Sequence, residues 1–143
     1  MNEKKDPRPA FHKRLPVLVR VTPKGFLIDD NPFERLEGRV SKTQLIRKLF
    51  EDHFLVCDSP DGTVARNGTI CAQCLHPRCR PQLRIHLAQG SVSYVIDLAI
   101  TSANNYFLLE DQARSQGARI DDWTLALSVV ERDYWGEVRF ERV

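Results

Sequence analysis

All four cysteines of this chain, Cys57, Cys71, Cys74 and Cys79, fall within one polar segment. Cys71 and Cys74 form a C-x-x-C pair, and the other two cysteines lie on either side of it. Four thiolates can bind zinc tetrahedrally, usually from one tight C-x-x-C turn and a second pair supplied by the returning chain. We therefore predict that these cysteines bind one Zn²⁺. Four protein ligands leave no open position for water or substrate, so this zinc would be structural.

The chain around these cysteines is rich in turn residues and poor in apolar ones, so it cannot be ordered by hydrophobic burial alone. Structural zinc can supply the missing free energy, about 10 to 16 kcal/mol in small peptides near neutral pH. A redox role for the C-x-x-C pair is disfavoured, because Pro77 and Pro81 follow where a thioredoxin-like motif needs a helix. Four unligated thiols in polar sequence are also disfavoured, since free cysteines prefer burial. His76 remains an alternative ligand in place of Cys57 or Cys79.

Basic side chains gather near the cysteines and on the strands expected beside them. As residues that could contact nucleic-acid phosphates we predict Arg39, Lys42, Arg47, Arg78, Arg80 and Arg84. Tyr134 and Trp135 lie in RDYWGE, a turn that should expose them as surfaces for base stacking. The alternative for Trp135 is that it covers an open end of the fold. Phe50 and Phe54 are expected to cap the core, with stacking on bases as the alternative.

The elements that must position these residues follow from the periodicity. Alternating apolar residues predict strands, and the spacing from Thr101 to Gly117 predicts a helix with Thr101 or Ser102 as N-cap. The predicted strands are 36–47, 82–88, 91–100, 123–130 and 137–143. Gly38 is placed for a bend that would let the first strand serve two sheets. This order, with a helix between the third and fourth strands and a long loop between the first two, is typical of the five-stranded OB-fold barrel. A mixed sheet with one packed helix has the same order.

The predicted organisation is a flexible basic arm over residues 1–14, an N-terminal hairpin and linker over 15–34, and an OB-like domain over 35–143. The zinc loop spans 51–81 of that domain. OB-folds bind oligonucleotides across the second and third strands, between the loops that join strands one to two and four to five. Here those loops are the cysteine loop and the turn with Tyr134 and Trp135.

Charge and composition narrow the function further. Residues 1–86 carry sixteen basic and ten acidic side chains, whereas residues 87–143 carry five and nine, so a polyanion would meet the first half. No segment has the length and hydropathy of a signal peptide or a membrane span, and we expect a cytoplasmic protein without membrane contact. Catalytic motifs such as a phosphate-binding loop or H-E-x-x-H are missing, so no enzymatic activity is expected. The competing function is a zinc-knuckle module that recruits or regulates a polymerase, integrase or nuclease.

The chain also resembles small zinc-containing, OB-fold-like single-stranded-DNA-binding proteins of bacteriophages and integrated mobile elements. The matching motifs are C-x-S-x-D-G at residues 57–62, G-x-x-C-x-x-C at 68–74, Cys79 before the strand with Leu83-Arg84-Ile85, and a strand running into TSA and a helix at 98–113. The resemblance covers roughly residues 36–143. It implies an accessory protein of DNA replication or recombination that binds single strands. The long acidic C-terminal tail with which many such proteins recruit partners is not found here, so recruitment by a tail is not expected.

Overall fold

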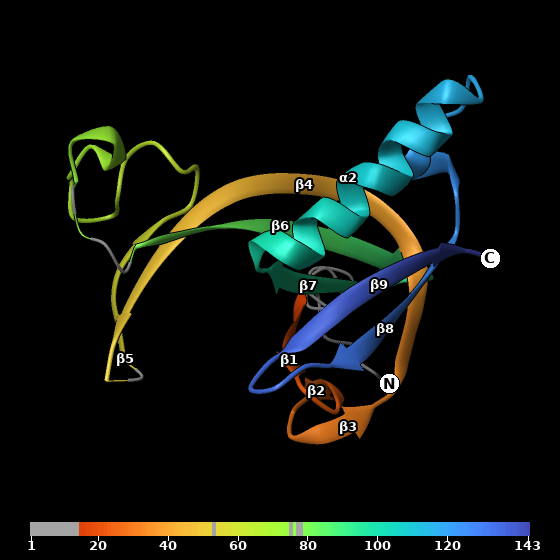
Figure 1. The fold of residues 1–143 in the computed structure, drawn as a ribbon, viewed down its shortest axis with the longest axis horizontal. Helices are drawn as coiled ribbons and strands as arrows, with labels where there is room; N and C mark the ends of the chain where they lie inside the picture. The colour runs from red at the N-terminus through yellow and green to blue at the C-terminus, as the bar shows by residue number, and fades with distance from the viewer. Residues whose placement is uncertain (1–14, 53, 75, 77–78) are drawn as a thin grey trace, which may run out of the picture.

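The structure is a computed structural model, and it describes residues 15–52, 54–74, 76 and 79–143. The predicted arm, residues 1–14, and the predicted phosphate contact Arg78 lie outside the described residues. The described part of the chain is mainly β, with a single α-helix (Figure 1). The strands are β1 (Val17–Thr22), β2 (Gly25–Ile28), β3 (Asn31–Phe33), β4 (Arg35–Glu51), β5 (Phe54–Ser59), β6 (Arg80–Gln89), β7 (Val92–Leu98), β8 (Leu125–Glu131) and β9 (Gly136–Arg142). The helix is α2 (Ile100–Ser115), and two short 3₁₀ turns cover Cys71–Gln73 and Ile120–Asp122.

The strands form one open, mixed sheet in the order β3-β2-β1-β7-β6-β4-β8-β9, and β5 pairs with β4 off this path. Every pair is antiparallel except β1 with β7. The five strands and the helix predicted from periodicity are therefore present in the predicted order, as β4, β6, β7, α2, β8 and β9. The N-terminal hairpin also joins this sheet, because β1 lies beside β7 with Val17 opposite Tyr94 and Val19 opposite Ile96.

Strand β4 is long and changes partner along its length. Its first residues, from Arg35 to Gly38, pair with β8, and the following residues pair with β6. The register with β6 shifts between Val40 and Lys42, which is where a bulge bends the strand. Gly38 allows a close approach at this crossing, because a Cβ there would lie 2.5 Å from the carbonyl oxygen of Ala88. The predicted bend near Gly38 thus lets one strand join two sets of partners, and β4 forms the long arc of Figure 1.

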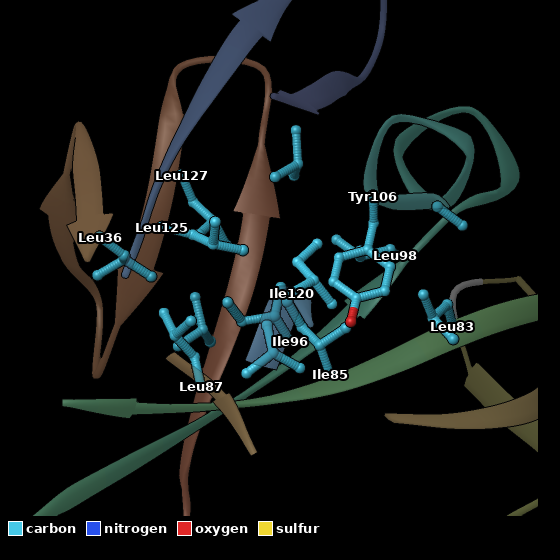
Figure 2. Close-up of a cluster of buried hydrophobic side chains, with 14 of the residues drawn as sticks. Leu36, Leu83, Ile85, Leu87, Ile96, Leu98, Tyr106, Ile120, Leu125 and Leu127 are labelled. Atoms are coloured by element: carbon cyan, nitrogen blue, oxygen red, sulfur yellow. The ribbon is translucent and has the colours of Figure 1, made fainter. Parts of the chain in front are cut away.

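The core lies between the sheet and α2. Alternate residues of β6, β7 and β8 point into it, and Figure 2 shows Ile85, Ile96 and Ile120 gathered near Tyr106 of the helix. Each fully buried Leu or Ile contributes about 1.5 to 3 kcal/mol relative to an exposed one. Trp123 is also buried in this core. Because these side chains point into the core, the residues between them on β6 and β7 point to the other face of the sheet.

The helix differs from the prediction at its start and agrees with it at its end. It begins at Ile100, so its N-cap is Ala99, which forms no side-chain cap, and the predicted N-caps are wrong. Ser102 is instead buried, and its Oγ accepts a hydrogen bond of 2.8 Å from the Val138 backbone N–H. The predicted end at Gly117 is confirmed, because that glycine has φ of 73°, a conformation that favours glycine and stops a helix.

The segment between β4 and β6 contains a strand that the sequence analysis did not predict. Strand β5 turns back along the far end of β4, and the register shifts between Leu49 and Phe50. Phe50 and Phe54 are 46% and 73% exposed, so the expectation that they cap the core is wrong. Figure 1 shows this hairpin and the chain that follows it projecting away from α2, β8 and β9.

Candidate nucleic-acid interface and metal centre

The chain after β5 begins with a tight turn organised by Asp61. Its Oδ1 accepts hydrogen bonds from the backbone N–H groups of Thr63 and Val64, at 2.8 and 3.0 Å. The Ser59 hydroxyl donates to the same oxygen at 3.0 Å. These three hydrogen bonds lower the pKa of Asp61. A short carboxylate side chain that bonds the backbone two residues on is typical of an Asx turn, and it orders the chain here without apolar burial.

A second turn brings the C-x-x-C pair back toward β5. The Ala65 N–H donates to the Thr69 carbonyl at 2.8 Å, and the Cys71 N–H donates to the Thr63 carbonyl at 2.8 Å. Gly68, with φ of 90°, occupies the turn between them. These bonds place Cys71 near the strand that carries Cys57.

All four cysteines line one small cavity of about 20 Å³, together with Arg47 and Ser59. A cavity needs roughly 10 to 15 Å³ to hold one water-sized sphere, so this one has room for a single small occupant. Burial raises the pKa of the Cys57 thiol, and the neighbouring Cys79, Cys74 and Cys71 raise it further. The four sulfur-bearing side chains are thus close enough to interact electrostatically. Even so, the described residues contain no group of three or more His, Cys, Asp or Glu side chains arranged so that it could hold a metal ion.

Arg47 lines this cavity, whereas His76, the alternative metal ligand, does not. Arg47 NH2 donates a long hydrogen bond, 3.4 Å, to the Cys79 carbonyl, and its buried Nε has no partner among the described residues. Arg47, a predicted phosphate contact, thus lines the same cavity as the four cysteines. His76 is not among the cavity's lining residues, and its Nε2 lies 3.3 Å from Glu51 Oε2.

The sheet face opposite the core carries an ion cluster centred on Asp97. Arg84 Nε and NH2 donate to the two carboxylate oxygens of Asp97 at 2.7 and 3.1 Å, and Lys48 Nζ contacts Oδ2. Burial alone would raise the pKa of Asp97, but the hydrogen bonds from Arg84 and Lys48 hold it below its usual value. The same carboxylate raises the pKa of Arg84. Asp97 therefore partly neutralises the predicted phosphate contact Arg84 and fixes its position.

Other basic residues of this face are less engaged. Lys42 is opposite His86 in the register, and burial, together with the charges of Lys42 and Arg84, lowers the pKa of His86. Arg80 lies opposite Lys48 at the start of β6. Lys42 and Arg80 are exposed and form no ion pair with another described residue. Arg39 lies further away, where its guanidinium reaches Asp121 and Asp122.

Tyr134 and Trp135 lie in the turn between β8 and β9 and are 92% and 40% exposed. Both line a cavity of about 250 Å³ that also includes Gln82 at the start of β6 and Asp97 near the end of β7. The turn packs closely on the end of β1, because a Cβ at Gly136 would lie 2.3 Å from the Thr22 carbonyl oxygen. The structure therefore joins the predicted stacking residues to the sheet face that carries Arg84.

A buried carboxylate holds this aromatic turn in place. Glu137 accepts hydrogen bonds from Asn105 at 2.8 Å, from Arg132 at 2.9 and 2.7 Å, and from Arg139 at 3.0 Å. The bonds from Asn105 and Arg132 lower the pKa of Glu137 to about 2. These contacts connect α2 with both ends of the turn. They limit the positions that Tyr134 and Trp135 can take.

Eight of the predicted site residues thus form two groups. The four cysteines and Arg47 surround the small cavity at the far end of β4, whereas Arg84, Tyr134 and Trp135 meet near Asp97. Sequence reasoning missed Gln82, Asp97 and Glu137, because each is a polar residue in an alternating strand and looks like an ordinary solvated position.

No helix among the described residues is long and apolar enough to cross a membrane. A scan against protein-family models and searches of curated proteins and solved structures find no match to this chain.

Proposed function

We propose that this protein binds single-stranded nucleic acid, DNA in the first instance, as a non-catalytic accessory protein of replication or recombination. The observation that carries this proposal is the shared cavity beside Asp97. Two exposed aromatic side chains, Tyr134 and Trp135, line it together with Asp97, and Asp97 in turn pairs with the basic residues Arg84 and Lys48. Single-strand binders combine these two features, since bases stack on aromatic rings while basic groups follow the phosphates.

An OB-like arrangement of the strands supports this function. The pairings of β4 with β6, β6 with β7, β4 with β8 and β8 with β9 are compatible with an OB-fold, although the sheet is open and β7 does not pair with β9. We propose that β1 completes the barrel-like wall, because it pairs with β7 and its end packs against Gly136 at the start of β9. The aromatic turn and the cysteine segment then lie at the two loops that flank an OB-fold's binding face.

We also propose that Cys57, Cys71, Cys74 and Cys79 hold a structural Zn²⁺. Their shared cavity suits one small ion, and His76 lies outside it, which favours four cysteine ligands over three with one histidine. The chemistry that zinc supplies here is cross-linking of the segment, since a site with four protein ligands is closed to substrate. Arg47 is placed to support this zinc site. Four thiolates leave the site negatively charged, and the guanidinium with its unpaired, buried Nε is placed to balance that charge.

The electrostatic contribution should be modest. Arg84 and Lys48 share Asp97, so the exposed Lys42 and Arg80 are the freer cations of the face. With roughly three phosphates neutralised, the logarithm of the affinity should fall with the logarithm of salt concentration with a slope of about −2.

The test is fluorescence anisotropy of labelled single-stranded oligonucleotides at two salt concentrations. Trp135→Ala should weaken binding by about 1 to 3 kcal/mol, the usual contribution of one stacked base. Phe54→Ala is the matched control, because it removes an exposed aromatic ring from the projecting hairpin and should leave binding unchanged. A metal-replete protein that ignores single strands even at low salt would refute the proposal.

One observation favours the alternative of a protein-docking module. Several large apolar side chains of the projecting hairpin and cysteine segment are 43% to 73% exposed: Phe50, Phe54, Leu55, Val56, Val64 and Ile70. Contiguous exposed apolar surface often marks a protein interface. Such docking would respond weakly to salt, so the salt series separates it from phosphate binding.

A further inference from the structure

The cavity beside Trp135 has the size and walls of a pocket for one flat ring. Its volume of about 250 Å³ lies below the roughly 300 to 1,000 Å³ of pockets that hold drug-sized ligands. Its walls come from segments distant in sequence: Val21 in β1 and Pro23 just after it, Leu98 at the end of β7, and Tyr134 and Trp135. An aromatic ring, with apolar side chains around it, is the usual surround of an unstacked base.

The polar side chains of this cavity differ in whether they are already paired. Both carboxylate oxygens of Asp97 are held by Arg84 and Lys48, and Ser102 Oγ already accepts the Val138 N–H. Gln82 Oε1, in contrast, is buried and has no hydrogen-bond partner among the described residues. A buried carbonyl oxygen without a partner is unfavourable, and few native groups are left in that state. A ligand that donates a hydrogen bond would satisfy it.

We propose that this cavity accepts one base of the bound strand and that Gln82 selects a base with an exocyclic amino group. The base ring lies against Trp135, and its amino group donates a hydrogen bond to Gln82 Oε1. Uracil and thymine carry a carbonyl in place of the amino group of cytosine, so in the same orientation they place an acceptor against Oε1, and their N3–H donor lies one position further round the ring. This inference rests on the proposed single-strand binding and adds a base preference to it.

The experiment compares oligodeoxycytidine with oligodeoxyuridine of equal length, because their bases differ at the amino or carbonyl group and the adjacent ring nitrogen. Anisotropy titrations at mildly alkaline pH should show a preference of about two- to tenfold for cytosine, the range expected from one hydrogen bond. Gln82→Met keeps the length of the side chain and removes the amide, so the ratio should fall to about one. Lys42→Ala should weaken both strands equally and leave the ratio unchanged.

The outcomes separate this inference from the function on which it rests. Salt-sensitive binding of both strands with no cytosine preference, or a preference that survives Gln82→Met, would overturn the base pocket and leave single-strand binding intact. Absence of binding to either strand would overturn both. A second measurement keeps Gln82 unchanged. In Trp123→Phe protein, where Trp135 is the remaining tryptophan, deoxycytidine monophosphate should quench emission more strongly than deoxyuridine monophosphate, and deoxyribose phosphate should not quench it.

Discussion

The two ends of β4 lie in regions that are stabilised in different ways. The first half of the strand pairs with β8 and β6 over a core in which Ile85, Leu125 and Leu127 are fully buried. Beyond its far end, the only buried residue between 60 and 74 is Ala65. Burial of apolar side chains is the dominant favourable term in folding, so the sheet body can order itself. The cysteine segment has turns and hydrogen bonds but little burial, and it needs a further source of stability.

Removing the proposed zinc should produce the largest difference between the two regions. Structural zinc sites contribute about 10 to 16 kcal/mol in small peptides, far more than the turns around Asp61 can supply. With a chelator, or in Cys74→Ser, amide hydrogen exchange of residues 60–74 should approach unprotected rates. Strands β7 and β8 should keep their protection. Equal protection of residues 60–74 with and without metal would show that the segment does not depend on zinc.

A cavity-forming change in the body should be the next largest effect. Leu127→Ala removes a fully buried side chain and should lower the free energy of unfolding by about 2 to 5 kcal/mol in urea titrations. Ile70→Ala, in the cysteine segment, removes a side chain that is 45% exposed. This change should alter the free energy of unfolding by less than about 0.5 kcal/mol. If Ile70→Ala were as destabilising as Leu127→Ala, the two regions would share one core.

Arg47 tests the link between the regions, because it extends from β4 toward the cysteines. Arg47→Met should weaken zinc binding about 10- to 100-fold, the usual effect of losing a residue that supports metal ligands. Arg80→Met is the matched control, since Arg80 is an exposed basic residue of the adjoining strand. Competition with a metal-binding dye measures both affinities. Equal affinities in the two variants would mean that Arg47 does not balance the charge of the site.

The same contrast explains which parts of the structure could be predicted. Alternation identified β6, β7, β8 and β9, because burial on one face leaves a period of two in the sequence. Strand β5 was missed because Phe54, Leu55 and Val56 are all exposed, so burial imposes no alternation on them. Spacing alone grouped the four cysteines that line one cavity. Zinc itself stays a prediction.

Gln82 and Asp97 could not be recognised from sequence for a different reason. Both occupy outward positions of regular strands, where a polar residue is ordinary. Their significance comes from what the fold places beside them: Trp135 lies about forty to fifty residues further along the chain. A pocket assembled from distant segments leaves no local pattern.

The smallest expected effect concerns the aromatic turn and its dependence on pH. The pKa of Glu137 is lowered from 4.5 to about 2 in the folded protein, so its contribution is present above pH 4.5 and is lost as the pH falls toward 2. Emission of Trp135 in Trp123→Phe protein should report loosening of the turn over this range. Glu137→Gln loses the charge that Arg132 and Arg139 hold, so its turn should be loose at neutral pH and change little in acid.

Glu141→Gln is the control for this change, because Glu141 lies on the same strand and is exposed. It should keep the acid transition of the unchanged protein. Asp61 and Asp97 also have lowered pKa values, so global unfolding in acid would not isolate Glu137, whereas a probe in the turn does. If Glu137→Gln kept the full acid transition at Trp135, the order of the turn would come from packing of Gly136 on β1 rather than from the carboxylate.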